Sequence, residues 1–509
     1  MEAKTNRKRL WTMREVCGYG TPSQTRERIL YLLKEGATGI NVIFDTPTMT
    51  GLDADHPFVE EDVGVQGVSV STPEDMNTLF DGVPCDKYST SIVVTSSAAP
   101  VLFSWFILSC ERREFDISTL RGTIQNDPIH HRWCGYPESM SPLELALQTC
   151  CDIIEFCAKN MKKWHPTNIN GYDLREWGCD AATEVALAFG IAQAYIDETL
   201  KRGLSVDDFA PQIGFYFSAN IHFFEEIAKF RAARRIVADL VRDTVSKIMR
   251  EKYKVKIQES ERLKFGVHTA GCSLYGKQIF NNIARVTTET LTAILGGAQS
   301  IHSCSFDEPI SLPSSLSHRV ALRTQQILAY EAKVGDIPVP DPFAGSYYIE
   351  KLTDEMEAKI IDVMRKIDNA GGAIEAVKSG LYDKILEESS LRSQMDIEEG
   401  KTIIVGVNYF PSEGEEEKFL KFFKIPKNVA KLRRKEVREF KRKRDIKSVR
   451  RALKSLTDMA EKSKSKNRTI NLIPYIIDAA KEGATLGETL GAVRVGFGYE
   501  YDPLDKKTK

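Results

Sequence analysis

The sequence has 509 residues, of which 42% are hydrophobic and 28% are charged, and its formal net charge is −1 at pH 7. A chain of this length can bury a large core, and it is expected to form more than one structural unit. The near-zero net charge argues against a general nucleic-acid-binding protein.

Two further features of the composition bear on location. The longest strongly apolar run, Val101 to Ser109, is far too short to span a membrane, and the basic N-terminus lacks the apolar segment of a signal peptide. Ten cysteines occur without a Cys-x-x-Cys motif, which predicts reduced thiols in the cytoplasm and no metal framework.

Short strand-like segments recur along the chain, and each is followed by a loop and a helix-like stretch. The first covers residues 41–45, after a helix-like segment from Arg26 to Glu35. The others are Ser89–Thr95, Thr123–Asp127, Asn168–Asp173, Ile213–Ser218, Phe265–Thr269 and Gln299–Ser305. Repeated units of this kind predict a parallel sheet, and about eight predict an α/β fold of the (β/α)8 TIM barrel type. Seven strands are clear, and the weak signal near Ile337–Pro340 is the candidate for the eighth.

Small polar residues alternate along these strands, whereas Val, Ile and Leu usually fill the centre of such a barrel. The alternating pairs are Ser89 and Ser91, Thr123 and Gln125, Asn168 and Asn170, and Ser303 and Ser305. If this face points inward, the axis is a lined tube that can admit a long, thin, polar ligand. The alternative is that these residues face the helices or form turns at strand ends.

Helical periodicity is clearest in Leu143–Met161 and Phe223–Met249. The mixed charges from Glu225 to Arg235 are expected to form a solvated outer face. These helices complete the pattern of a barrel enclosed by helices.

The composition shifts near residue 411. Ser412–Lys418 is acidic, Lys431–Arg451 is strongly basic, and residues 468–496 are amphipathic. The basic segment is interpreted as an exposed helix, with a nucleic-acid patch as the alternative. The prediction is therefore a barrel with an N-terminal arm over residues 1–425, and a helical extension over 426–509 that docks on the barrel or on a partner.

Few motifs of known chemistry are present. There is no Ser-His-Asp motif, no Walker loop and no His-Glu-x-x-His. His268 and His302 lie near the C-terminal ends of predicted strands, where each either faces the tube as a hydrogen-bond donor or belongs to the core. His130 and His131 are adjacent, so on a strand their rings would point apart, and no metal site is predicted.

Three carboxylates, Asp45, Asp127 and Asp173, each end a predicted strand. Together at one mouth of a barrel they could bind a cation or a hydroxylated substrate. They could equally cap the helices that follow, and capping is the preferred interpretation for Asp45.

A series of motifs, in order along the chain, resembles the methylmalonyl-CoA mutase family. The run Arg9-Leu10-Trp11-Thr12-Met13-Arg14 is similar to the Arg-Pro-Trp-Thr-Ile-Arg opening of that family. Further matches are Gly51-Leu-Asp53-Ala-Asp55-His-Pro57, Asp62-Val-Gly64-Val-Gln-Gly67-Val, Gly122-Thr-Ile-Gln125-Asn126-Asp127, Phe209-Ala-Pro211, Ala228-Lys-Phe-Arg231-Ala-Ala-Arg234, Asn281-Asn282-Ile-Ala-Arg285, Gln299-Ser300-Ile-His302, Ser305-Phe-Asp307-Glu308, Asp341-Pro342-Phe-Ala-Gly345-Ser346 and Val405-Gly406-Val407-Asn408. The resemblance covers residues 8–410.

The resemblance implies a radical rearrangement. The family uses adenosylcobalamin to move a carbon-bearing group between adjacent carbons of an acyl-CoA, and small hydroxyl side chains line a channel through its barrel for the pantetheine arm. The cofactor supplies the radical, and the protein supplies binding, orientation and exclusion of water. Matched positions that would line the channel or hold coenzyme A are Arg9, Thr12, Arg14, Asn41, Ser91, Thr123, Gln125, Tyr172, Gln299 and Ser300, with Gln212 as a further substrate-binding position.

The family's cobalamin domain carries an Asp-x-His-x-x-Gly motif, which supplies the lower axial histidine. That motif does not occur in this sequence. The resemblance therefore implies a large subunit of a hetero-oligomer, whose adenosylcobalamin is mostly held by a separate small subunit. The amphipathic tail is the expected docking segment.

Departures from the family pattern bear on the substrate. Val16 stands where methylmalonyl enzymes have a Tyr, Asp173 where they have a His, and Gln212 where they have an Arg. Gly266 replaces a channel His, and His268 replaces a Gln. The candidate catalytic residues are accordingly Val16, Tyr172, Asp173 and His268.

The family's carboxylate-binding Arg lies in a loosely aligned segment after Asp127, where Arg132 is nearby but out of register. A buried carboxylate without its cation is costly, which argues against methylmalonyl-CoA. Val16 resembles the 2-hydroxyisobutyryl-CoA mutase branch, in which Asp173 or His268 would contact the substrate hydroxyl. The alternatives are a genuine methylmalonyl-CoA mutase and a non-catalytic binding barrel.

Overall fold

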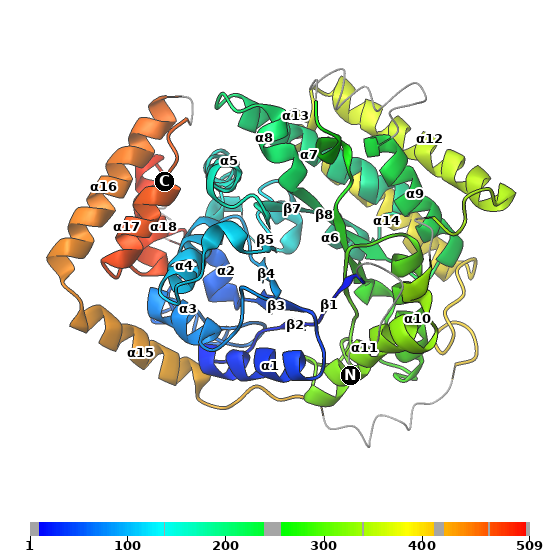
Figure 1. The fold of residues 1–509 in the computed structure, drawn as a ribbon, viewed down its shortest axis with the longest axis horizontal. Helices are drawn as coiled ribbons and strands as arrows, with labels where there is room; N and C mark the ends of the chain where they lie inside the picture. The colour runs from blue at the N-terminus through cyan, green and yellow to red at the C-terminus, as the bar shows by residue number, and fades with distance from the viewer. Residues whose placement is uncertain are drawn as a thin grey trace.

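Ten strand segments, which together form the eight parallel strands of a barrel, lie at the centre of the protein (Figure 1). The computed structural model describes residues 10–136, 138–238, 256–337, 341–411, 422–466 and 469–504. One sheet has the strand order β1-β10-β9-β8-β7, and the other has the order β2-β3-β4-β5-β6. The strands are β1 (Thr12–Arg14), β2 (Val16–Cys17), β3 (Gly39–Ile43), β4 (Ser89–Val93), β5 (Gly122–Ile124), β6 (Trp164–His165), β7 (Thr167–Asn170), β8 (Ile213–Ala219), β9 (Phe265–Thr269) and β10 (Ser300–His302).

The two sheets share two strands, and each of these strands is interrupted by one residue. β1 and β2 are one strand broken at Glu15, and β6 and β7 are one strand broken at Pro166, whose nitrogen has no hydrogen to donate to the ladder. Each sheet ends on one half of each broken strand, so the ring is complete.

All seven clear strand predictions overlap observed strands, but the eighth was placed in the wrong part of the chain. Ile337 has no strand conformation, and residues 338–340 lie outside the described residues. The eighth strand is instead Thr12–Cys17, which the sequence assigned to an N-terminal arm. Its signal is weak because it is short and carries the buried polar residues Arg14 and Glu15.

Helices surround the barrel, and several of them begin at residues whose side chains cap the first turn. For example, Thr21 caps α1, and Pro22 occupies its first turn. The helices are α1 (Pro22–Lys34), α2 (Thr46–Thr50), α3 (Pro73–Phe80), α4 (Ala99–Glu111), α5 (Leu143–Asn160), α6 (Tyr172–Glu176), α7 (Ala181–Leu200), α8 (Val206–Phe209), α9 (Phe223–Ala238), α10 (Asn281–Leu295), α11 (Ser315–Gln326), α12 (Tyr347–Asn369), α13 (Ala373–Lys378), α14 (Leu381–Glu398), α15 (Val429–Lys443), α16 (Ile446–Ser465), α17 (Ile473–Lys481) and α18 (Leu486–Gly496). Within the described residues, none of them combines the length and apolar character needed to cross a membrane.

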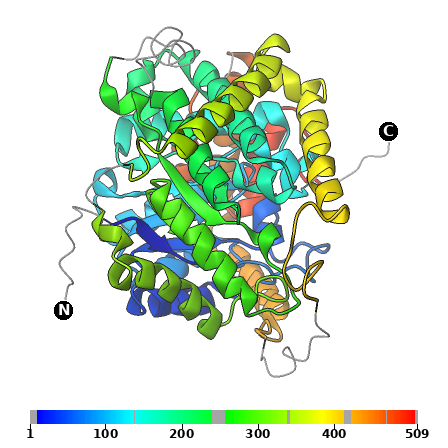
Figure 2. The same ribbon diagram turned by 90° about the vertical axis from the view of Figure 1, so that its right-hand side faces the viewer.

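Two outer layers cover the helix ring on different sides. α12 packs over α7 and α9, and α13 and α14 pack on α7 (Figure 2). The C-terminal helices α15 to α18 lie on the other side of the barrel, where α17 packs on α4 and α5 (Figure 1). α4 is therefore buried all round, which explains why Val101 to Ser109 is apolar without being a membrane span.

The C-terminal extension is fixed to the barrel by charge as well as by apolar packing. Arg433 lies 2.5 Å from Asp75, and Lys441 lies 2.9 Å from Asp53 in the loop after α2. Arg433 is only 3% exposed. The helix prediction for Lys431–Arg451 is confirmed by α15 and α16. The expectation that this segment is simply exposed is wrong, because part of its charge is paired with carboxylates of α3 and of the loop after α2.

The charges of α9 also differ from expectation. Glu226 and Lys229 are fully buried, because α9 lies between the barrel and α12. The Nζ atom of Lys229 lies 2.7 Å from Glu184 Oε2 and forms an ion pair with Glu226, which in turn contacts Arg175 at 3.1 Å. The predicted solvated face is therefore, in part, a buried network of two cations and two carboxylates. The remainder of the predicted helix, 239–249, lies outside the described residues.

Candidate active site

Two cavities follow one another along the barrel axis. All eight strands contribute to the lower one, and seven contribute to the upper one, which is also lined by Gln125 directly after β5. The lower cavity, of about 610 Å³, lies at the N-terminal ends of the strands, and the upper cavity, of about 440 Å³, lies at their C-terminal ends. Tyr216 on β8 lines both. The strand residues of the lower cavity include Thr12, Arg14, Asn41, Ser89, Ser91, Thr123, His165, Asn168, Gly266 and Ser300, and those of the upper cavity include Val16, Ile43, Val93, Asn170, His268 and His302. The barrel is therefore hollow, as the alternation of small polar residues predicted.

The lower cavity offers unpaired hydrogen-bonding groups to a ligand. Asn41 Oδ1 and Thr123 Oγ1 are buried and have no hydrogen-bond partner among the described residues. Buried polar atoms are nearly always paired, so these two indicate a polar occupant. Arg121, Lys163 and Lys264 lie at the open end of the same cavity, where they provide positive charge for an anionic group.

The side chain of Arg14 lines the lower cavity and is hydrogen-bonded to residues of β10 and β4. Its Nε donates to Ser300 Oγ at 2.8 Å, and its Nη1 and Nη2 donate to the carbonyl and hydroxyl oxygens of Ser89 at 2.8 and 2.7 Å. A Cβ atom at Gly39 would lie 2.9 Å from the guanidinium carbon, so glycine is needed at that position. Burial lowers the pKa of Arg14 to about 10, which still leaves it charged at neutral pH.

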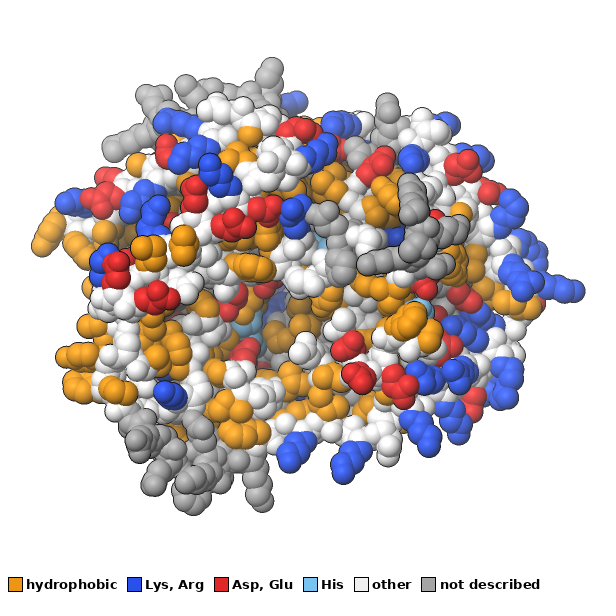
Figure 3. Space-filling view, turned by 180° about the vertical axis from the view of Figure 1, so that it is seen from behind, with side chains coloured by type: hydrophobic (Ala, Val, Ile, Leu, Met, Phe, Trp, Pro, Cys, Tyr) orange, Lys and Arg blue, Asp and Glu red, His pale blue; other side chains and the backbone are white. Residues whose placement is uncertain are grey.

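The upper cavity has a different character. Among the described residues that line it, there is no Lys or Arg, whereas four histidines line it. Viewed from behind, the molecule is hollowed near the centre of that face, and histidine is visible in the hollow (Figure 3). A substrate carboxylate would therefore find no lysine or arginine cation in this cavity.

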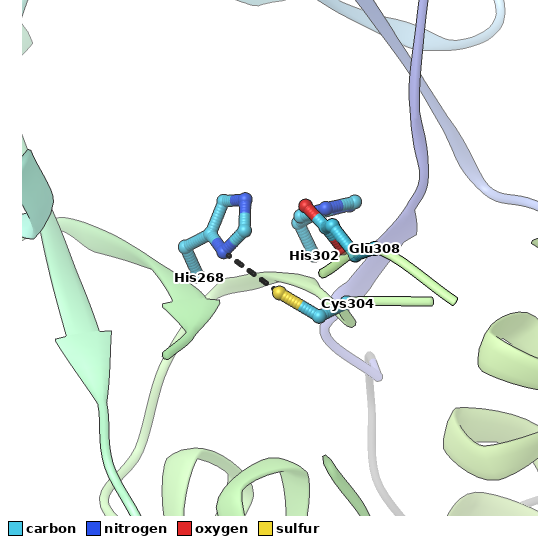
Figure 4. A group of neighbouring side chains, drawn as sticks. All are labelled: His268, His302, Cys304 and Glu308. Carbon is cyan, nitrogen blue, oxygen red and sulfur yellow. Dashed lines mark hydrogen bonds between the residues drawn. The ribbon is translucent and has the colours of Figure 1, made fainter. Parts of the chain in front are cut away.

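His268 and His302 lie beside each other (Figure 4), and their hydrogen bonds define which nitrogen of each ring carries a proton. Their rings are nearly perpendicular, with centroids 4.1 Å apart. His268 Nδ1 lies 2.7 Å from the carbonyl oxygen of Thr269, which can only accept, so Nδ1 carries the proton and Nε2 is left as an acceptor. The Val16 amide donates to His302 Nδ1 at 3.1 Å, so there the proton is on Nε2. Burial lowers the pKa of His268 to about 4 and that of His302 well below its usual value, so both rings are neutral at pH 7.

Tyr172 stacks on His268. Its ring lies 4.1 Å from that of His268, and it comes from the start of α6, directly after β7. Val16 lines the same cavity. The pair His268 and His302 thus presents one acceptor and one donor nitrogen, beside an aromatic wall and a small aliphatic side chain of the upper cavity.

A second group in the upper cavity was not foreseen from the sequence. His130 and Cys134 belong to a 3-10 helix, His130–Cys134, and contact Asp173 at the start of α6. The Nε2 atom of His130 lies 2.5 Å from Asp173 Oδ2. Burial opposes a charge on His130, yet its neighbours Cys134 and Asp173 raise its pKa well above the usual value.

His131 is a further unforeseen feature of the same segment. It lines the upper cavity, it is 3% exposed, and neither of its ring nitrogens has a partner among the described residues. Burial, followed by the nearby charge of His130, lowers its pKa to about 4. The expectation that the two histidine rings point apart on a strand is wrong, because the segment is helical.

The structure places most of the predicted site residues in the two cavities. Thr12, Arg14, Asn41, Ser91, Thr123, Gln299 and Ser300 line the lower one, and Val16, Gln125, Tyr172, Asp173 and His268 line the upper one. Arg9 lies outside the described residues. Gln212 lines neither cavity, since its Nε2 donates to the carbonyl oxygens of Met161 and Trp164. Ser303 and Ser305 also line neither, and Ser303 contacts Thr290 of α10 instead.

The three strand-end carboxylates do not form one group. Asp45 caps α2 by accepting from the Thr48 amide at 3.0 Å, as preferred from the sequence. Asp127 accepts from the Asn170 amide at 2.8 Å and also borders the upper cavity with Asp173. Arg132 points elsewhere and lies 2.9 Å from Asp383 of α14, so it is not a cation of the cavity.

Comparison with known proteins connects this site to a family. The sequence matches the family described as methylmalonyl-CoA mutase over residues 1–499. The chain belongs to that family. It is 36% identical over 499 residues to the 2-hydroxyisobutanoyl-CoA mutase large subunit of Aquincola tertiaricarbonis, which covers 98% of this chain and 86% of that subunit.

Relatives named methylmalonyl-CoA mutase are similarly close. The chain is 36% identical to the protein of Rhizobium meliloti and 34% identical to the mitochondrial protein of Homo sapiens, in both cases over 491 residues and 96% of this chain. It spans only 66% and 63% of the lengths of those two proteins. These relatives are named as mutases, which are isomerases, and the family assignment from sequence motifs is confirmed.

Proposed function

We propose that this chain is the large subunit of an adenosylcobalamin-dependent acyl-CoA mutase that rearranges a hydroxylated acyl group, of the 2-hydroxyisobutyryl-CoA and 3-hydroxybutyryl-CoA type. The observation that carries the proposal is the upper cavity, which pairs one acceptor nitrogen with one donor nitrogen and has no Lys or Arg among its described lining residues. A hydroxyl group both donates and accepts, so it satisfies both nitrogens, whereas a carboxylate satisfies only the donor.

The lower cavity supports binding of the coenzyme A arm. Its hydroxyl and amide side chains provide partners along the axis, including the unpaired Asn41 Oδ1 and Thr123 Oγ1. The cations at its open end suit the phosphates of coenzyme A, because Lys and Arg bind phosphate strongly. An arm threaded from this end would place the thioester at the upper cavity, where the walls of the barrel exclude water.

The open end of the upper cavity suits a cobalamin carried by a partner. Exposed apolar side chains occur in the segments that follow the strands: Trp177, Ile221, Phe280 and Ile310, with Phe224 in the first turn of α9. An apolar rim of this kind fits the face of a corrin ring and a protein surface around it. When bound, the cofactor would supply the carbon radical that starts the rearrangement. His131, with both ring nitrogens unpaired, provides a further contact for cofactor or substrate.

A second subunit is part of this proposal. The relative in Aquincola tertiaricarbonis is named a large subunit, which implies a small-subunit partner for that protein. Because α15 to α18 already pack on the barrel, the faces of these helices that point away from it are the proposed docking surface for the small subunit.

A substrate panel tests the proposal directly. The chain should be combined with adenosylcobalamin and the small subunit encoded by a neighbouring reading frame that carries the Asp-x-His-x-x-Gly motif. We expect turnover of 3-hydroxybutyryl-CoA or 2-hydroxyisobutyryl-CoA to exceed that of methylmalonyl-CoA by about 100-fold, since an unpaired buried carboxylate costs several kcal/mol. Faster turnover of methylmalonyl-CoA would contradict the proposal, and acyl-CoA binding without any turnover would identify a non-catalytic barrel.

Replacing His268 by Phe removes the acceptor nitrogen and keeps a ring against Tyr172. We expect turnover of the hydroxyacyl-CoA to fall by about 10- to 100-fold, because a buried hydrogen bond to the substrate is lost. An acyl-CoA without the hydroxyl makes no such hydrogen bond, so its turnover should change by less than about threefold. His222→Phe, an exposed histidine, is the control. An equal fall for both substrates would show that His268 only supports the fold.

A further inference from the structure

Three side chains of types that bind metals meet in the wall of the upper cavity: His130, Cys134 and Asp173. We propose that they bind a divalent metal ion of the zinc class and leave a fourth coordination position open to the cavity. Three protein ligands with one open position are the usual arrangement of a catalytic zinc site.

The local backbone brings the three groups together. Within the short 3-10 helix His130–Cys134, Cys134 Sγ lies 3.5 Å from His130 Nε2. Asp173, from the first turn of α6, places its Oδ2 2.5 Å from the same nitrogen and 3.9 Å from the sulfur. A single ion can therefore reach all three atoms.

The distances are close to those of a tetrahedral site. Bonds of about 2.0–2.3 Å from zinc to N, O and S ligands imply distances of about 3.4–3.6 Å between ligand atoms. The two distances that involve sulfur, 3.5 and 3.9 Å, lie within about 0.4 Å of that range. The distance between His130 and Asp173 must lengthen by about 0.9 Å, which a rotation of the carboxylate can supply when the metal replaces the proton between them.

Neighbouring groups hold these ligands in place. Asn170 Nδ2 donates to Asp173 Oδ2 at 2.6 Å, and the His130 amide donates to Asp127 Oδ1 at 3.2 Å. Such outer contacts orient metal ligands. The open position would take an oxygen ligand: water, or the hydroxyl or thioester carbonyl oxygen of an acyl-CoA. That the oxygen comes from an acyl-CoA rests on the proposed function, whereas metal binding does not.

A second group of ligand types, His268, His302, Cys304 and Glu308, lies in the same region (Figure 4). It is the poorer site, because His302 Nδ1 accepts the Val16 amide and leaves a protonated Nε2, which has no lone pair for a metal. A metal in the first group should be lost in Cys134→Ser, whereas a metal in the second group should be lost in Cys304→Ser.

The test measures metal content and spectra of the full chain, purified without a histidine tag. Elemental analysis after dialysis against limiting Zn²⁺ should find about one ion per chain, since one site of this kind is expected. Replacement by Co²⁺ should produce visible bands of tetrahedral cobalt together with a thiolate-to-cobalt absorption. Cys134→Ser should remove the thiolate band, and Asp173→Asn should weaken Co²⁺ binding by at least about tenfold. Added Zn²⁺ should raise the unfolding temperature of the wild-type chain but not that of Cys134→Ser.

Two cysteine variants are matched controls. Cys304→Ser tests the second group. Cys272→Ser removes an exposed thiol that belongs to neither group of ligands. Both should retain the wild-type spectrum and metal content. The proposal is overturned if no ion binds, if Cys304→Ser rather than Cys134→Ser removes the band, or if all variants bind equally, which would mean adventitious metal. Because no substrate is used, these results are independent of the substrate panel.

Discussion

Replacing Lys229 by Met is expected to lower the free energy of unfolding by about 3–5 kcal/mol, because it leaves buried carboxylates without their cation. Lys229 is fully buried, and it contacts Glu184 at 2.7 Å, Glu226, and the carbonyl oxygen of Ser218 at 2.8 Å. Methionine keeps most of the volume of the side chain, so the expected loss comes from charge rather than from a cavity. The measurement is the shift in the denaturation midpoint, followed by circular dichroism.

Lys351→Met is the control for this prediction. Lys351 is on α12 and 77% of its side chain is exposed, so its replacement should change the free energy of unfolding by less than about 0.5 kcal/mol. If Lys229→Met is as stable as Lys351→Met, the buried carboxylates do not depend on the charge of Lys229, and the prediction is wrong.

The same network supports the upper cavity. Arg175 contacts Glu226 at 3.1 Å and belongs to α6, the short helix that begins with Tyr172 and Asp173. Ser218 belongs to β8, and its amide donates to Glu184 at 2.7 Å. The buried charges therefore tie α6 to a strand of the barrel, close to the residues proposed to contact the substrate.

The fold was largely predictable because its strands are short, regularly spaced and separated by periodic helices. Seven strands and the hollow axis follow from that pattern. The strand Thr12–Cys17 does not, because Arg14 and Glu15 are polar residues that are buried only once the barrel has closed around them. The burial of Lys229 could not be predicted either, since the charges of α9 follow the same spacing as a solvated face, and only α12 excludes water from them.

The site was predictable where residues lie on strands and less so where they lie in loops. Thr12, Asn41, Ser91 and Thr123 line the lower cavity because alternation along a strand fixes their direction. The segment His130–Cys134 follows a strand, and its helical conformation carries no signal in the sequence. His130, His131 and Cys134 were therefore missed as members of the site, although the substitution at Asp173 pointed to a change in the same cavity.

Replacing Ser91 by Phe is expected to close the channel and raise the dissociation constant for acyl-CoA by at least about 100-fold, which corresponds to about 2.8 kcal/mol. Ser91 lines the lower cavity on β4, between Asn41 on β3 and Thr123 on β5 in the same register. A phenyl ring at this level would project into the space that the pantetheine arm must cross. Binding can be measured by calorimetry with the chain alone.

Two variants separate blockage from other effects. Ser91→Ala removes only the hydroxyl, so binding should weaken by no more than about fivefold, the value of one hydrogen bond. Thr90→Val changes the neighbouring residue, which lines neither cavity, and should leave binding unchanged. Wild-type affinity in a folded Ser91→Phe chain would mean that coenzyme A does not pass through the barrel. The proposed reaction in the upper cavity requires a thioester that reaches this cavity along the barrel axis. That result would therefore remove the physical basis of the proposed function.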